Sequence, residues 1–322
     1  MPELPEVEVT RRGIDGPLRG AQVQAVRMGK PLRWPLGVAP QSLVGRVAGP
    51  VQRRGKYLWL PLAAAVALGE ASADVPADAP RDSPRDAPRD APRDAPAEAP
   101  PDAPAEVTSA APADPPGLLL HLGMSGSLAW LPAAPPPGPH DHFDLVTSQG
   151  TLRLNDPRRF GAVVWSPGLL MAPAATLLAR LGPEPFDPAL TPGHLHAALQ
   201  RHRAAVKTVL LAGGAVVGAG NIYACEALFL AGIHPALRSD RVSRPRAARL
   251  LQALRDTLGR AMDLGGSSLR DFSDAHGVSG AYQQHAAVYG RQGADCRRCG
   301  GTIRRVEQAQ RSTYFCPGCQ KR

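Results

Sequence analysis

Four cysteines near the end of the chain constrain its fold more than any other feature. Cys296 and Cys299 form one pair with two residues between them, sixteen residues follow, and Cys316 and Cys319 form a second pair. Two such pairs supply the four thiolates of a tetrahedral Zn²⁺ site. Two disulfides are the alternative, which a reducing compartment disfavours. The spacing therefore predicts one structural zinc ion with no open coordination position for chemistry.

The segment between the cysteine pairs is expected to form a short β-hairpin. Residues 302–306 and 313–315 are both strand-like, and this segment contains Arg304, Arg305 and Arg311. Zinc would fold this hairpin and direct its arginines without taking part in catalysis. The fifth cysteine, Cys225, lies on a predicted helix and is expected to be a buried, inert thiol.

A long internal segment differs in composition from the rest of the chain. Residues 70–116 consist mainly of Ala, Pro, Asp and Arg, with a Pro-Arg-Asp-Ala repeat over residues 80–96. This pattern predicts a disordered, extended insertion without a core. Its eleven acidic residues and four arginines give it a charge of −7, so the remaining chain has 33 basic and 17 acidic residues, a net +16. An excess of this size favours a polyanionic partner such as nucleic acid.

The sequence offers little sign of a membrane or a secretion signal. The longest apolar run, residues 58–68, contains a proline and is shorter than the roughly 20 residues that span a bilayer. The start lacks a basic region followed by an apolar signal core. We expect a cytoplasmic, nucleoid-associated monomer without membrane contact.

The first residues, Met-Pro-Glu-Leu-Pro-Glu, place an amine and carboxylates together. Removal of Met1 would expose the secondary amine of Pro2, and an α-amino group titrates near pKa ~8, below the ~10.4 of lysine. Such an amine can attack a sugar carbon and form an iminium, with Glu3 moving protons. Pro5 suits the first turn of a helix that would bury an apolar stripe. A solvated tail is the alternative reading of these residues.

The first half of the chain has the pattern of a β domain. Strand-like stretches occupy residues 21–27, 42–51, 56–60, 117–121, 140–146 and 151–155. Lys56 follows two arginines and a glycine at the mouth of a predicted strand, where it would face phosphate or substrate, although a solvated turn fits nearly as well. Met124 lies at the tip of a glycine-rich turn, where a packing role is the alternative.

A second turn combines cationic and aromatic residues. Arg158, Arg159 and Phe160 follow Asp156-Pro157. Guanidinium groups beside an aromatic ring can hold phosphates and insert a wedge into a base stack. A structural ion-pair corner is the alternative.

The second half has the pattern of a helical domain. A helix is expected over residues 191–210, followed by a glycine turn, a helix from Asn221 and an amphipathic helix over residues 246–262. Backbone amides of the glycine turn could bind a phosphate. Asn221 could instead simply cap its helix.

Taken in order, these motifs closely resemble bacterial formamidopyrimidine-DNA glycosylase, a family that includes 8-oxoguanine DNA glycosylases with lyase activity and is related to endonuclease VIII. The resemblance covers nearly the whole chain except residues 70–116. It implies an α+β fold with an N-terminal helix and β-sandwich at 1–176, a helix-two-turns-helix domain at 177–285 and a zinc finger at 286–322. It also implies that residues 267–283 include the loop that covers the lesion.

The resemblance assigns catalytic roles residue by residue. Pro2 would attack C1′ of the damaged nucleotide in duplex DNA with oxidised bases or abasic sites, and Glu3 would be the proton donor. Lys56 would serve β-elimination and Arg311 δ-elimination.

The resemblance also assigns DNA contacts. Met124, Arg158 and Phe160 would fill the gap that the everted lesion leaves. Further backbone contacts are expected from His140, Arg158, Asn221 and Lys56. The family has a phosphate-contacting lysine before the glycine turn, where this chain has Arg201-His202-Arg203, so His202 or a flanking arginine would take that place.

Two other functions remain open at the level of sequence. A glycosylase of the endonuclease VIII type would prefer oxidised pyrimidines, and a zinc-finger protein that senses damaged DNA would break no bond. The acidic insertion also suggests that it lowers affinity for undamaged DNA. Deleting residues 72–114 should then tighten binding to undamaged duplex at low salt, and an unchanged affinity would contradict this.

Overall fold

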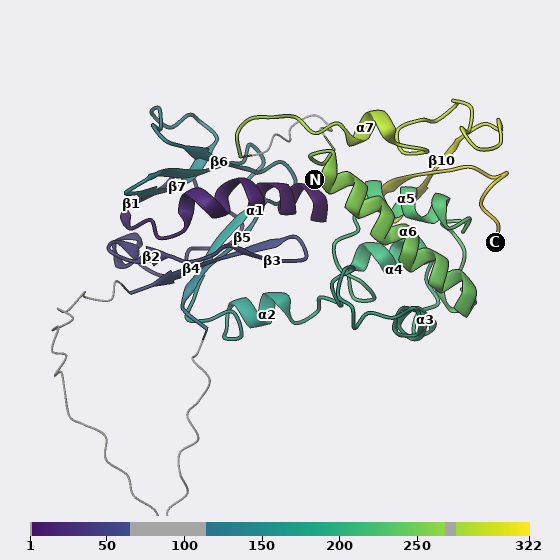
Figure 1. Ribbon diagram of the computed structural model, residues 1–322, viewed down its shortest axis with the longest axis horizontal. Helices are drawn as coiled ribbons and strands as arrows, with labels where there is room; N and C mark the ends of the chain where they lie inside the picture. Colours follow the sequence, from purple (N-terminus) through teal and green to yellow (C-terminus); the bar gives the residue numbers. More distant parts are fainter. Residues whose placement is uncertain (1, 65–113, 268–274) are drawn as a thin grey trace, which may run out of the picture. The chain divides into compact units, whose positions relative to one another are not determined.

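The computed structural model describes residues 2–64, 114–267 and 275–322 (Figure 1). Most of the acidic insertion and part of the predicted lesion-covering loop therefore lie outside the described residues. The helices, including short 3-10 turns, are α1 (Leu4–Leu18), η1 (Pro40–Leu43), α2 (Ala174–Leu178), α3 (Pro192–Gln200), α4 (Val206–Ala212), α5 (Asn221–Leu230), η2 (Ser239–Arg241), α6 (Arg244–Asp263) and α7 (Tyr282–His285). The strands are β1 (Val23–Met28), β2 (Val47–Ala48), β3 (Gln52–Arg54), β4 (Tyr57–Ala63), β5 (Gly117–His121), β6 (Ser127–Leu131), β7 (Asp141–Thr147), β8 (Gly150–Asn155), β9 (Ala162–Ser166), β10 (Arg304–Gln308) and β11 (Arg311–Phe315).

Two antiparallel sheets form the β domain. One has the strand order β1-β7-β8-β6, and the other has the order β2-β4-β5-β9 with β3 paired to β4. Alternate residues of both sheets share one apolar core, which includes Leu60, Leu120, Phe143 and Leu152. The predicted β-sandwich is therefore confirmed.

The helix α1 joins this core through its apolar stripe. Val7, Ile14 and Leu18 are all buried there, as the sequence predicts. Pro5 lies in the first turn, where its missing N–H costs no helical hydrogen bond. Replacing Ile14 with alanine should cost about 2–5 kcal/mol of stability.

The helices α3 to α6 form a second core around Leu199, Leu210, Leu228 and Leu254. The predicted single helix over residues 191–210 is wrong, because it is broken at 201–205. The chain there pairs with another segment: Val206 donates to the Leu237 carbonyl and Ser239 donates to the Ala204 carbonyl. These tertiary hydrogen bonds replace the helical ones.

The strand predicted over residues 42–51 is mostly absent from the described structure. Within residues 42–51 the structure has the end of η1 and only the two-residue strand β2. Gly45 has φ +83°, a left-handed conformation that interrupts an extended chain.

The N-terminus lies beside the helical domain (Figure 1). Leu4 packs with Ile222, Tyr223 and Leu258 in a small core that links α1 to α5 and α6. The cysteine-bearing segment packs on α5 through Phe229, Val288 and Ile303. In the part of the chain that the structure describes, no helix is both long and apolar enough to cross a bilayer.

Candidate active site

The carboxylate of Glu3 is held by backbone amides from a segment far away in the sequence. Its oxygens accept hydrogen bonds from the N–H groups of Gly220 at 2.7 Å, Ile222 at 2.9 Å and Tyr223 at 3.4 Å. These donors form the N-terminus of α5, whose dipole also favours a negative charge. Glu3 thus occupies three amides at the end of the glycine turn, and phosphate binding by the turn itself stays a prediction.

Glycine is required where Glu3 meets this turn. A Cβ at Gly220 would lie 2.3 Å from Cδ of Glu3, and one at Gly218 would lie 2.4 Å from Leu4. Gly218 also has φ +97°. The glycines that interrupt the helical pattern thus allow the N-terminal residues to approach the backbone closely.

Glu6 fixes the start of the chain from the other side. It accepts hydrogen bonds from the Glu3 N–H at 2.8 Å, the Tyr223 hydroxyl at 2.5 Å and the Ser267 N–H at 2.7 Å. Pro2 is buried next to these residues. The terminus is consequently held in place, and the reading of these residues as a solvated tail is wrong.

Burial shifts the proton affinities of Glu3 and Lys56 towards each other. Burial raises the pKa of Glu3, against the opposing effects of Lys56 and of the backbone amides. Burial lowers the pKa of Lys56, which the carboxylates of Glu3 and Glu6 oppose. The site therefore holds an acid that retains its proton more readily, and a base that releases one more readily, than either does in water.

The two arginines before Lys56 have structural partners. Arg53 forms ion pairs with Glu8 at 3.0 Å and Glu184 at 2.7 Å. Arg54 also pairs with Glu184, which in addition accepts from the Gly55 N–H at 2.6 Å. These contacts fix the turn that carries Lys56, so they favour a positioning role for the arginines over phosphate binding.

His121 lies near Lys56 and was missed as a site residue. Both line a cavity of about 300 Å³ beside the glycine turn. Nδ1 of His121 accepts a hydrogen bond from the Gly123 N–H at 3.0 Å, which leaves Nε2 as the protonated nitrogen of the neutral ring. Burial, with Lys56 and Arg33, lowers its pKa to about 4. A strand-end histidine before a glycine-rich turn was the available signal in the sequence.

Asn221 does not cap α5, because Gly220 occupies that position. Its side chain accepts from Nζ of Lys207 at 2.6 Å and donates to the Ser312 carbonyl at 2.9 Å. The fully buried Lys207 also donates to Thr313 Oγ1 at 2.7 Å. Asn221 and Lys207 therefore fasten the hairpin strand β11 to the helical domain.

Lys207 is a further residue that the sequence reasoning missed. It is a single cation in the otherwise apolar run of α4, which was the usable signal, since a buried lysine needs partners. His202, which the resemblance suggests for a phosphate contact, is exposed. Its role in DNA binding stays a prediction.

Cys225 is fully buried, and burial raises the pKa of its thiol to about 11, as expected of an inert thiol.

The hairpin β10–β11 presents Arg311 at its turn. Arg311 pairs with Gln308, and the two residues between them, Ala309 and Gln310, have positive φ. Arg311 is exposed and is one of the charges that lower the pKa of Lys56. The structure therefore places the predicted catalytic arginine in the electrostatic environment of the predicted catalytic lysine.

The four cysteines of the terminal segment cluster as predicted. Their Sγ atoms all lie within 4.8 Å of one another, and two pairs are 3.8 and 3.4 Å apart. A tetrahedral ion with Zn–S bonds of about 2.3 Å separates its sulfur atoms by roughly 3.8 Å, so the donor set fits zinc. Bound there, Zn²⁺ would hold the segments on both sides of the hairpin together.

The residues predicted to enter the duplex lie on two neighbouring turns. Arg158 stacks on the Phe160 ring at 5.2 Å, and the exposed fraction of Phe160 is 43%. Met124 is half-buried, less exposed than the sequence suggested, and His140 is exposed before β7. An exposed aromatic ring with a cation stacked on it suits insertion between bases.

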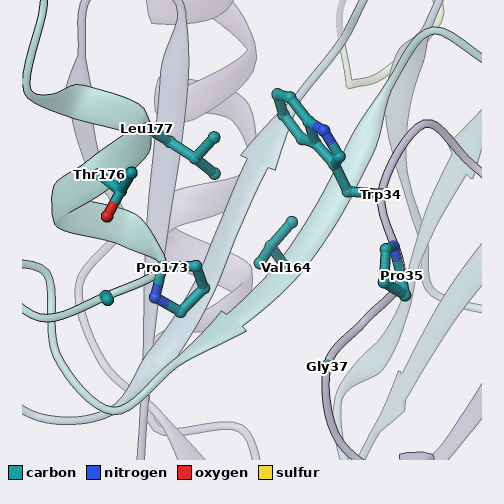
Figure 2. A pocket seen from close by; sticks show the side chains of 8 residues that line it. Trp34, Pro35, Gly37, Val164, Pro173, Thr176 and Leu177 are labelled. Atoms are coloured by element: carbon teal, nitrogen blue, oxygen red, sulfur yellow. The ribbon is translucent and has the colours of Figure 1, made fainter.

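Figure 2 shows a different cavity, of about 390 Å³, between α2 and the loop over residues 34–37. Trp34, Val164, Pro173 and Leu177 line it together with other uncharged residues. It contains no acid, base or predicted site residue. Its lining is therefore unsuited to proton transfer.

The chain matches models of known families over three segments. Residues 1–163 match the formamidopyrimidine-DNA glycosylase N-terminal domain, residues 181–273 match its H2TH domain, and residues 295–322 match a zinc finger found in FPG and IleRS. The formamidopyrimidine-DNA glycosylase of Variovorax paradoxus is 51% identical over 321 residues, covering 100% of both chains.

Solved structures resemble the chain over its full length. The MutM (FPG) protein of Thermus thermophilus is 32% identical, with a TM-score of 0.75 and coverage of 99% of this chain and 98% of that one. A Lactococcus lactis FPG mutant in complex with DNA containing Fapy-dG is 27% identical, with a TM-score of 0.78 and full coverage of both chains.

Proposed function

Because this chain belongs to the formamidopyrimidine-DNA glycosylase family, we propose that it is a bifunctional DNA glycosylase and lyase that removes oxidised purines from duplex DNA. The observation that carries the proposal is the amide-bound, buried carboxylate of Glu3 next to Pro2, with Lys56 in its electrostatic environment. The L. lactis neighbour was solved with DNA containing Fapy-dG, which supports an oxidised purine as substrate.

The first step uses the nitrogen of Pro2 after removal of Met1. The free amine attacks C1′, the bond from C1′ to the base breaks, and the base leaves with a proton. Glu3, whose pKa is raised by burial, delivers a proton to the sugar ring oxygen, which opens the ring and leaves an iminium on Pro2.

Strand cleavage follows from the iminium. It acidifies C2′, so loss of that proton expels the 3′ phosphate; Lys56, with its lowered pKa, suits proton transfer in this step. A second elimination expels the 5′ phosphate, with the exposed Arg311 as the candidate proton donor. Hydrolysis then releases the sugar fragment and restores the Pro2 amine.

The DNA contacts are proposed on the same basis. Met124, Arg158 and Phe160 would fill the space left by the everted nucleotide, since reaching C1′ requires that eversion. His140, Asn221 and His202 or a neighbouring arginine would contact the backbone. Bound zinc would hold the hairpin that presents Arg311. The chain would divide into three parts, residues 1–176, 177–285 and 286–322.

Borohydride trapping tests the proposal. The protein is incubated with a duplex containing 8-oxoguanine in the presence of borohydride, and the cross-linked peptide is mapped by mass spectrometry. DNA should be found on Pro2, and a Pro2→Gly variant should lose most of the adduct. A folded, zinc-loaded protein that binds the duplex but gives no adduct would exclude the lyase mechanism. A strong preference for thymine glycol would instead indicate the pyrimidine-specific alternative.

A further inference from the structure

One buried carboxylate joins the two turns that carry Met124, Arg158 and Phe160, here called the wedge residues. Asp156, which is fully buried, accepts a hydrogen bond from the Ser125 hydroxyl at 2.8 Å, next to Met124. It also accepts from the Gly161 N–H at 2.7 Å and the Arg158 N–H at 3.3 Å. Its two oxygens thus hold both ends of the turn around Phe160 and the neighbouring Met124 turn.

The two turns also touch through their backbones. A Cβ at Gly123 would lie 2.4 Å from the Gly161 nitrogen and 2.4 Å from the Phe160 carbonyl carbon. Arg159 has φ +57°, a left-handed conformation that costs energy for a residue with a side chain, so the turn that carries Phe160 needs external support. Asp156 supplies that support with three accepted hydrogen bonds, and its own N–H donates to the His140 carbonyl at 2.9 Å.

We propose that Asp156 is a positioning residue that sets Met124, Arg158 and Phe160 as one unit for entry into the duplex. The inference rests on the proposed function, which gives those three residues their role in the gap. A carboxylate with two acceptor oxygens can serve one hydroxyl and two amides together. An asparagine at this position would turn its NH₂ towards at least one N–H donor and lose that contact.

The test compares Asp156→Asn with wild type on two substrates. One duplex contains 8-oxoguanine beside the fluorescent base 2-aminopurine, whose stopped-flow signal reports entry of the wedge. The other contains a preformed abasic site, which has no base to evert. Asp156→Asn should lose most of the fluorescence change and excise 8-oxoguanine about tenfold more slowly, while cleavage at the abasic site changes less than about threefold.

Two further variants separate positioning from loss of stability. Asp144 is a buried carboxylate on β7 that binds Arg27 and Arg153 and not the wedge turns. Asp144→Asn should lower the melting temperature and leave the ratio of the two substrate rates unchanged. Ser125→Ala removes one of the three bonds and should give a smaller loss of the fluorescence change, about threefold in rate.

The outcomes distinguish this inference from the proposed function. If Phe160→Ala abolishes the fluorescence change while Asp156→Asn and Ser125→Ala retain it, the role of Asp156 is wrong and the wedge stands. If Phe160→Ala also retains the signal, the wedge assignment itself fails. Should Asp156→Asn not fold, a wild-type signal and rate in Ser125→Ala overturns the inference.

Discussion

The site around Glu3 and the hairpin around Arg311 both present a proposed proton donor, but they are built in different ways. Glu3 is 2% exposed and is held by backbone amides of α5. Arg311 is exposed at the tip of a hairpin that is fastened by Lys207, Asn221 and the cysteine cluster. The role of Glu3 depends on burial, and the role of Arg311 depends on how the hairpin β10–β11 is attached to the rest of the protein.

This difference follows from the protonation that each residue needs. Desolvation raises the pKa of a carboxyl group and so helps it to hold a proton, so a buried, fixed position suits the role proposed for Glu3. An arginine is protonated in almost any setting, so Arg311 does not need to be buried. It needs a position from which its side chain can extend to the DNA. Accordingly, changes in the two regions should differ in how much activity they remove and in which step they affect.

The largest expected effect is that of Glu3→Gln. The glutamine cannot donate the proton, and its NH₂ would face the amides of Gly220 or Ile222. Excision of 8-oxoguanine in single turnover should fall about 10²–10⁴-fold, the range attributed to general acid catalysis. Glu8→Gln, which breaks ion pairs on the same helix, is the matched control and should lower stability more than rate. Equal losses in both variants would contradict a specific role for Glu3.

Disrupting the cysteine cluster should affect the other region. Cys316→Ser, or removal of metal by a chelator, should unfold the hairpin, because four thiolates and one ion hold its ends. We expect affinity for a duplex with an abasic-site analogue to fall about tenfold to a hundredfold, since each loss of about 1.4 kcal/mol is a factor of ten. Zinc content by elemental analysis and binding by fluorescence anisotropy check this. Full affinity in zinc-free protein would show that the hairpin is not required for binding.

Replacing Lys207 with methionine should produce a smaller defect. The substitution leaves Asn221 Oδ1 and Thr313 Oγ1 without their donor, at a cost of about 1–3 kcal/mol each. Affinity for lesion DNA should fall about tenfold, and Lys207→Met combined with Asn221→Ala should lose less than the sum of the two. Lys30→Met removes an exposed charge and serves as the control. Additive losses would indicate that the two residues act independently.

The smallest expected effect concerns His121 and pH. Its pKa of about 4 lies below the ordinary 6.5, so the unfolded chain binds a proton first as the pH falls. Stability should therefore be full above pH 6.5 and should decline between pH 6.5 and 4. The shift corresponds to about 3 kcal/mol, which screening at a partly exposed ring reduces to about 1–2 kcal/mol. In denaturant melts, the free energy of unfolding of His121→Asn should depend less on pH than that of wild type. An unchanged pH dependence would show that other groups cause the decline.

Local patterns were sufficient for several features. The apolar stripe of α1, the cysteine cluster and the buried thiol of Cys225 all follow from spacing and residue type, and the structure confirms each. These features depend on neighbours in the chain or on a fixed ligand spacing. Where the prediction was wrong, as for the helix over residues 191–210, the deciding hydrogen bonds came from segments more than thirty residues away.

The contacts of charged residues were less accessible to sequence reasoning. The amides of Gly220 and Ile222 hold the carboxylate of Glu3, and Lys207 binds Thr313; the sequence predicted neither contact. Their partners, Glu3 and Thr313, lie far off in the chain. A sequence states which groups need a partner, but it does not state which distant group supplies one.

The sequence by itself determined the helix that begins at Leu4, the donor set for a metal and the excess of positive charge outside residues 70–116. The tertiary structure alone decided that α5 receives the carboxylate of Glu3 and that Asp156 joins the two wedge turns. The physical reason is that periodicity and ligand spacing act over a few residues. The burial that shifts a pKa, by contrast, depends on surfaces that meet only after the chain has folded.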